Sequence, residues 1–187
     1  MFNLFRNTKT RETIERLYGA IVAQSRRTDF YTDFAVPDTM DGRLEMLMLH
    51  TVLVCRRLKG GSEIERALSQ DIFDAFAADM DRTMREIGVG DLTVPKKMKK
   101  IGAAFYGRAA AYDSALAAEG EDALAQAVTR NIFTLGEAAP PPGARALAAY
   151  ARAAAAELAA TPFEVLARGE LPLTAPAAPG PLARENR

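Results

Sequence analysis

Apolar residues recur at intervals of three and four positions along most of the chain, the spacing that places side chains on one face of an α-helix. This pattern predicts helices over residues 10–25, 43–59, 62–87, 95–119, 121–135 and 144–160. We find no convincing run of the apolar–polar alternation that is typical of β-strands. The sequence therefore predicts an all-α fold, a single domain of about six helices.

The stretch from Leu44 to Leu58 differs from the others because apolar residues occupy nearly all of its sides. A helix that is apolar all round is normally buried among its neighbours. We therefore expect this segment to be the central helix, with the other helices packed around it. The pair Gly60 and Gly61 is expected to end it.

The third segment begins with a capping-box sequence, because Ser62 and Glu65 stand three positions apart. An apolar stripe follows, made of Ile64, Leu68, Ile72, Phe76, Met80 and Ile87. Gly88 is expected to end this helix, and Pro95 suits the first turn of the next one. The connection GVGDLTVP is predicted to be a turn between the two helices.

The end of the chain changes in composition, because ELPLTAPAAPGPLARENR is rich in proline and alanine. Segments of this kind do not bury enough apolar surface to fold on their own. We therefore expect a helical domain over residues 1–168 and a flexible tail over residues 169–187.

Composition narrows the class of protein further. The 187 residues have a formal net charge of +0, with 49% apolar residues and one cysteine, Cys55. A lone cysteine makes no internal disulfide, which favours a reducing compartment. The N-terminus lacks the apolar region of a signal peptide, and the apolar run 46–55 has about half of the ~20 residues needed to span a bilayer. We therefore expect a soluble cytoplasmic protein.

The motifs that could support catalysis are weak. His50 and Cys55 lie five positions apart on one predicted helix, so they point in different directions and do not form a nucleophilic pair. One histidine and one cysteine also make a His/Cys zinc site improbable. The pentapeptide DMDRT, which starts at Asp79, matches an aspartyl-nucleophile pattern, but that chemistry needs a strand end and this stretch is predicted to be helical. We expect no enzyme activity and no cofactor.

The chain concentrates four of its six lysines within five residues, at Lys96, Lys97, Lys99 and Lys100. They fall in the first turns of a predicted helix, where the helix dipole disfavours cations. Arg108 adds a fifth positive charge on the same helix. One interpretation is a solvated surface; the other is a site for an anion, namely phospholipid headgroups, ribosomal RNA or acidic loops of a protein partner.

Several stretches together resemble the ubiquinol–cytochrome c chaperone family, which assists assembly of the respiratory cytochrome bc1 complex. They are LYGAIVAQSRRTDFY, VPDTMDGRLEMLMLH, ALSQDIFDAFAADMDRTMREIGVGDLTVPKKMKKIGAAFYGR and AYDSAL. These stretches occur in the family's order and span about residues 17 to 116. The part GVGDLTVPKKMKK…AFYGR is the most specific.

The resemblance implies an all-helical, non-catalytic protein that binds newly made cytochrome b as its client. It places the chain at the cytoplasmic face of the inner membrane as a peripheral protein, with the ribosome or an anionic membrane surface as further partners. Mitochondrial relatives also use a small partner protein. No DNA partner is expected. The alternative is a helical RNA- or ribosome-binding module that uses Lys96 to Lys100.

A client with apolar helices needs an apolar docking surface. For this surface the sequence offers the loop aromatics and nearby residues Phe30, Tyr31, Phe34, Met40 and Arg43. Met46 and Met48 extend this candidate surface, because methionine adapts to varied partners, although a stripe of methionines is also consistent with a core. Arg43 has a second interpretation, a structural ion pair with Asp38 or Asp41.

Overall fold

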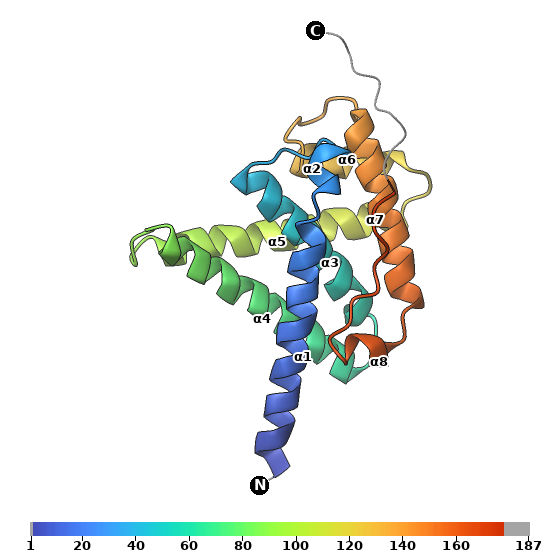
Figure 1. Ribbon diagram of the computed structural model, residues 1–187. Helices are drawn as coiled ribbons and strands as arrows, with labels where there is room; N and C mark the ends of the chain where they lie inside the picture. The colour runs from blue at the N-terminus through green and yellow to red at the C-terminus, as the bar shows by residue number, and fades with distance from the viewer. Residues whose placement is uncertain (1, 178–187) are drawn as a thin grey trace.

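The computed structural model (Figure 1) describes residues 2–177, with side chains from residue 10 onward. Six longer helices and two single turns make up this part of the chain, and no strand occurs in it. They are α1 (Phe2–Ser25), α2 (Asp29–Thr32), α3 (Met40–Lys59), α4 (Glu63–Glu86), α5 (Val94–Ala117), α6 (Asp122–Asn131), α7 (Pro142–Ala160) and α8 (Phe163–Leu166). The predicted all-α domain is confirmed.

Helix α3 is the centre of the fold, as its sequence predicts. It packs against α1, α4, α5 and α7, which surround it in Figure 1. Nine consecutive residues of α3, those numbered 46–54, are buried, together with residues 42 and 58. Because these side chains point in all directions around the helix, their burial requires neighbours on every side.

Local capping fixes where α3 and α4 begin. The hydroxyl of Thr39 accepts a hydrogen bond from Gly42 N at the start of α3. At the start of α4, Ser62 accepts from Glu65 N at 3.3 Å, and the Glu65 carboxylate accepts from Ser62 N at 2.7 Å. The predicted capping box is therefore present, and it satisfies amide groups that have no partner within the helix.

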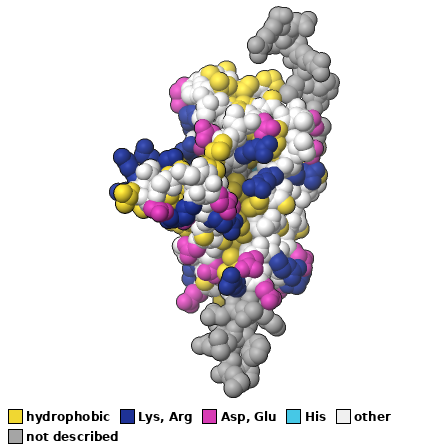
Figure 2. Space-filling view, turned by 60° about the vertical axis from the view of Figure 1, so that its left-hand side comes forward, with side chains coloured by type: hydrophobic (Ala, Val, Ile, Leu, Met, Phe, Trp, Pro, Cys, Tyr) yellow, Lys and Arg dark blue, Asp and Glu magenta, His cyan; other side chains and the backbone are white. Residues whose placement is uncertain are grey.

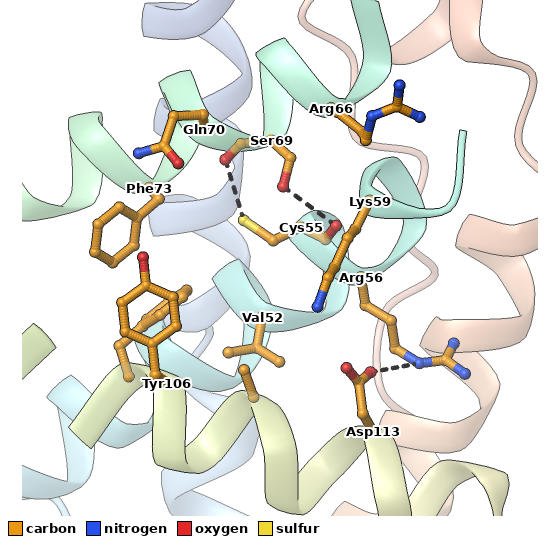
Figure 3. Close-up of a pocket in the computed structure, with 12 residues that line it drawn as sticks. Val52, Cys55, Arg56, Lys59, Arg66, Ser69, Gln70, Phe73, Tyr106 and Asp113 are labelled. Carbon is orange, nitrogen blue, oxygen red and sulfur yellow. Dashed lines mark hydrogen bonds and ion pairs between the residues drawn. The ribbon is translucent and has the colours of Figure 1, made fainter. Parts of the chain in front are cut away.

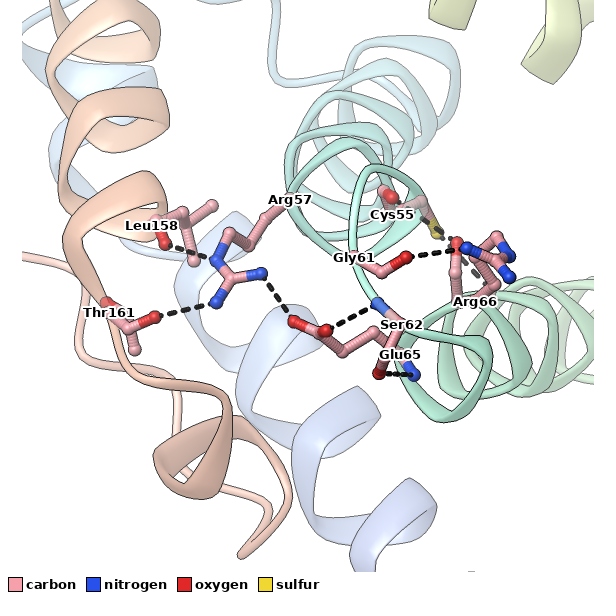
Figure 4. Close-up of polar contacts among 9 residues, drawn as sticks. Cys55, Arg57, Gly61, Ser62, Glu65, Arg66, Leu158 and Thr161 are labelled. Atoms are coloured by element: carbon pink, nitrogen blue, oxygen red, sulfur yellow. Dashed lines mark hydrogen bonds and ion pairs between the residues drawn. The ribbon is translucent and has the colours of Figure 1, made fainter.

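The end of α3 is tied to two other helices through Arg57 (Figure 4). Its guanidinium donates to the carbonyl oxygens of Leu158 and Thr161, each at 3.0 Å, and to the Glu65 carboxylate at 2.8 Å. The first two acceptors lie at the C-terminal end of α7, where carbonyl groups lack helical partners. One side chain thus connects α3, α4 and α7.

Two glycines let the loop between α2 and α3 pack closely on the starts of two helices. A Cβ atom on Gly42 would lie 2.0 Å from the carbonyl oxygen of Pro37, and one on Gly143 would lie 2.1 Å from that of Phe34. Both contacts are with backbone atoms, so no side chain can move aside to make room. This loop is therefore held against α3 and α7.

Helices α4 and α5 form a long hairpin that projects from the body, on the left in Figure 1. Gly88 follows α4 with φ of 84°, the left-handed conformation that ends many helices. The predicted apolar stripe of α4 is wrong at both ends, because Ile64 is 69% and Ile87 54% exposed. These residues lie in the first turn of α4 and just beyond its last residue, where no helix covers them.

The segment after α8 runs back along α7 (Figure 1). Thr174 N donates to the Glu157 carboxylate at 2.9 Å, and the Thr174 carbonyl accepts from Gln24. Leu171 and Leu173 pack against the core. These contacts attach residues 171–174 to the body, whereas residues 178–187 of the predicted tail lie outside the described part. The division at residue 168 stays a prediction.

Candidate functional site

The lysine cluster lies at the free end of the α4–α5 hairpin. All four lysines are exposed, in the first two turns of α5, where Figure 2 shows dark blue side chains on the projecting part. Within residues 10–177, none of the four forms an ion pair or a hydrogen bond through its ammonium group. The structure therefore brings these four predicted residues together as unpaired charges.

Arg108 lies apart from this cluster. It is eight residues beyond Lys100, which corresponds to about 12 Å along the helix. Its guanidinium makes two hydrogen bonds with the Glu45 carboxylate, at 2.6 and 3.0 Å, and both side chains are largely buried. The Arg108 charge is thus offset by a carboxylate on α3 and joins α5 to the central helix. It does not add to the exposed charge of the lysines.

The residues proposed for the client surface divide into two groups. Phe30 and Phe34 are buried, with exposed fractions of 0% and 1%, and Met46 and Met48 of α3 are buried as well. Phe30 contacts the rings of His50 and Tyr150, so it belongs to the core and offers no docking surface in this conformation. A single turn of helix, α2, directs it inward, which the loop sequence did not reveal.

The remaining three lie near the start of α3. Met40 is 68% exposed, and Arg43 forms an exposed ion pair with Asp38 at 2.6 Å. The Arg43 guanidinium also lies 5.6 Å from the centre of the Tyr31 ring. The structural interpretation of Arg43 is therefore confirmed with Asp38. Met40 and Arg43 are thus exposed at the start of α3, whereas Tyr31 is half-buried against the core beneath the Arg43 guanidinium.

The residues weighed for catalysis have structural partners. Asp79 of α4 accepts a hydrogen bond from the hydroxyl of Tyr18 in α1 at 2.9 Å. It also forms an ion pair with Arg82 of the same helix. Cys55 donates to Ser69 O, and burial raises the pKa of its thiol to about 11. A nucleophile would need a lowered thiol pKa, so Cys55 is set up for packing and not for attack.

The structure shows an apolar groove that the sequence did not predict (Figure 3). It is a cavity of about 250 Å³ between α3, α4 and α5. Phe73 of α4 and Phe105 and Tyr106 of α5 form its aromatic side, with ring centres 4.9 Å apart for Phe73–Phe105 and 5.3 Å for Phe73–Tyr106. Tyr106 is 60% exposed, so an aromatic face is open to solvent.

Cations border the other side of the groove. Arg56 and Lys59 come from the end of α3, and Arg66 from the start of α4 (Figure 3). Arg56 is paired with Asp113 at 2.9 Å, and Arg66 donates to Gly61 O. Lys59 makes no ion pair within the described side chains. The groove thus combines an aromatic wall with a positively charged border.

One signal in the sequence points to this groove. Phe73 and Tyr106 each directly follow a residue of the buried stripe, Ile72 and Phe105 respectively. An aromatic residue one position beyond a stripe lies at the edge of the buried face, about 100° round the helix. Whether two such edges face each other depends on how α4 and α5 pack.

The geometry defines a helical protein with two distinctive surface features: an aromatic groove and a projecting, positively charged hairpin. The family model described as ubiquinol-cytochrome C chaperone matches residues 32–175. The chain belongs to this family, which confirms the resemblance seen in the sequence. A comparison with curated proteins gave no match.

A solved structure agrees with this family membership. The crystal structure of the Cbp3 homolog from Brucella abortus matches with 42% sequence identity and a TM-score of 0.82. The match covers 92% of this chain and 96% of that chain. Neither comparison supports the alternative of an RNA-binding module. Among the described helices, none combines the length and apolar character that a bilayer crossing requires.

Proposed function

We propose that this chain is a non-catalytic assembly chaperone that binds newly made cytochrome b and holds it until it enters the cytochrome bc1 complex. Family membership supports the role in assembly of that complex. The groove between α3, α4 and α5 supports the binding role, because an apolar helix of a membrane protein needs an apolar surface to cover it. The proposed location is peripheral, at the cytoplasmic face of the inner membrane, and the family's role in respiratory complex assembly supports it.

The exposed face of the groove is the observation on which this proposal depends. Tyr106 leaves 60% of its surface open, beside the half-buried ring of Phe73. A large aromatic residue exposed next to other apolar side chains is typical of interfaces, where tyrosine often supplies binding energy. Lys59 and Arg66 at the border suit a client helix that has a carboxylate near one end.

The experiment that tests this function compares three forms of the full chain in cells that lack the native protein. They are the wild type, Tyr106→Glu, and Leu135→Glu as a matched control, because Leu135 is 49% exposed and lies outside the groove. Cytochrome b captured from solubilised membranes and the amount of assembled bc1 complex are measured in each. Thermal unfolding establishes that each variant is folded.

We expect loss of the bc1 complex without the chain, while other respiratory complexes persist. Tyr106→Glu should capture roughly a tenth of the wild-type amount or less, since it places a charge on the apolar face. Leu135→Glu should behave as the wild type. Normal bc1 assembly without the chain would contradict the function. Full capture by Tyr106→Glu would contradict the groove as the client site. An additional Met40→Glu variant that then lost capture would assign the client to the exposed start of α3.

A further inference from the structure

The end of the α4–α5 hairpin places exposed apolar and positively charged side chains side by side. Leu92, in the turn between the helices, is 98% exposed, and Ile87 is 54% exposed. Two residues after Leu92, Val94 is fully buried and attaches the turn to the fold. Leu92 is therefore held outward on a fixed base, and Figure 2 shows apolar and dark blue side chains at the end of this projection.

Folding does not account for an exposed leucine in this position. A side chain that keeps 98% of its surface in water contributes almost nothing to the core. The turn needs glycine at position 88, where φ is positive, but it has no such need for an apolar residue at position 92. Leu92 and Ile87 form an apolar tip that the rest of the structure does not cover.

The charges around this tip are unbalanced. On α4, Arg82 pairs with Asp79, and Arg85 pairs with both Asp81 and Asp91. The four lysines of α5 have no such partners among the described residues, and the exposed Glu86 at the end of α4 makes no ion pair there either. An excess of positive charge therefore surrounds Leu92 and Ile87.

We propose that the hairpin end docks on an anionic lipid bilayer, with Leu92 and Ile87 inserted between headgroups and Lys96, Lys97, Lys99 and Lys100 on the lipid phosphates. Juxtaposed apolar and basic side chains match the two layers of a bilayer surface, an anionic headgroup region above hydrocarbon. This inference deepens the membrane location in the proposed function, and it does not depend on the identity of the client.

The apolar side chains distinguish a lipid surface from RNA. Proteins that bind single-stranded RNA stack the bases on aromatic rings. The residues exposed at the tip are aliphatic, and the nearest exposed aromatic residue, Tyr106, lines the groove. Leucine and isoleucine gain from entry into hydrocarbon and have no comparable interaction with a base.

Binding of the purified full chain to vesicles tests this surface directly. Two compositions serve as probes, phosphatidylcholine alone and phosphatidylcholine mixed with phosphatidylglycerol, and single-stranded polyuridine is the nucleic-acid probe. One variant changes all four lysines to glutamine, and a second is Leu92→Ser. Two double variants are compared with each other: Lys96→Gln with Lys97→Gln, and Arg11→Gln with Arg145→Gln. Both pairs remove two exposed positive charges, but only the first lies at the tip.

We expect binding to the anionic vesicles and not to phosphatidylcholine alone. The quadruple change should weaken binding roughly a hundredfold or more, and Leu92→Ser about tenfold. The Arg11 and Arg145 pair should bind as the wild type does. Three results would each overturn the proposal. The first is no binding of the wild type to anionic vesicles, and the second is an equal loss of binding in both charge pairs. The third is tighter binding to polyuridine than to vesicles, with the Leu92→Ser variant binding as the wild type does.

Insertion itself has a separate signal, because the chain contains no tryptophan. In a Leu92→Trp variant, the single indole should shift its emission to shorter wavelength on anionic vesicles and be quenched by brominated acyl chains. A Leu135→Trp variant is the control and should show neither change. Unchanged emission from position 92 on saturating vesicles would overturn insertion. Since these measurements contain no cytochrome b, their failure would leave client binding unaffected.

Discussion

The imidazole Nε2 of His50 lies 2.9 Å from the hydroxyl of Tyr150. The other ring nitrogen, Nδ1, lies 2.8 Å from Met46 O, which can only accept, so Nδ1 is the donor. In the neutral ring Nε2 then accepts the Tyr150 proton, and Gln24 donates to the same hydroxyl at 3.0 Å. Side chains from α1, α3 and α7 thus meet in a network around His50, and the burial of the ring favours its uncharged form.

Protein stability should depend on pH through this histidine. Burial lowers the pKa of His50 from 6.5 to about 4. Between these values the unfolded chain binds the proton more readily, so the stabilisation is complete above pH 6.5 and is lost as the pH falls toward 4. We expect the free energy of unfolding to fall by up to roughly 3 kcal/mol over this window. Urea unfolding at several pH values measures it.

A His50→Gln variant provides the control for this pH dependence. Glutamine keeps hydrogen-bonding groups but does not fill the place of the ring, so the variant should be less stable overall. Because glutamine does not titrate, the free energy of unfolding should also change less with pH between 6.5 and 4. A slope equal to that of the wild type would assign the pH dependence to other groups.

Substitution of Arg57 should be costly, because its guanidinium satisfies two carbonyl groups and one carboxylate in a poorly hydrated place. We expect Arg57→Ala to lower the free energy of unfolding by roughly 2–4 kcal/mol. The matched control is Arg56→Ala on the same helix, whose partly exposed ion pair with Asp113 should contribute less than about 1 kcal/mol. Equal effects in chemical denaturation would refute a special role for Arg57.

The close approach at Gly143 predicts opposite effects for two glycine substitutions. Gly143→Ala forces a Cβ atom against Phe34 O and should destabilise the protein by roughly 1–3 kcal/mol. Gly107→Ala, in the middle of α5, meets nothing within 4 Å and should stabilise it by roughly 0.5–1 kcal/mol. Thermal unfolding of both variants measures the difference, and a shift of the same sign in both would contradict the packing described.

The Cys55 thiol should react slowly, which makes it a probe of the groove. With its pKa raised to about 11, the thiolate fraction at pH 8 is roughly a hundredfold below that of an ordinary thiol. Iodoacetamide labelling in the native protein should therefore be at least tenfold slower than in urea. Labelling should rise steadily with pH beyond 9, the ordinary thiol value. A plateau near pH 9 would contradict this environment.

Local features could be predicted from the sequence, and contacts between distant segments could not. The capping box of Ser62 and Glu65 involves neighbours in the chain, so its pattern is visible directly. The burial of α3 follows from its apolar sides in the same way. The sequence predicts Phe30 at the surface, and this is wrong. Its burial depends on contacts with His50 and Tyr150, which are 20 and 120 residues away and cannot be read from the local pattern.

The candidate sites show the same division. The positive end of the hairpin could be predicted, because four lysines within five residues require no tertiary information. Arg108 looked similar in the sequence, but Glu45 on another helix offsets its charge. The groove depends on how the edges of α4 and α5 face each other. Periodicity places Phe73 and Tyr106 at those edges but does not give the packing of one helix on the other.

The length of the α4–α5 hairpin sets the distance between the groove and the surface on which the tip docks. The groove and the docking tip share these two helices, and Phe105 lies eleven residues beyond Val94, a rise of about 16 Å along α5. With the tip on a bilayer and α5 along the bilayer normal, the hairpin would hold the groove at about this distance above the phosphates. A client helix that is leaving or entering the membrane would then meet the groove just outside the headgroup layer.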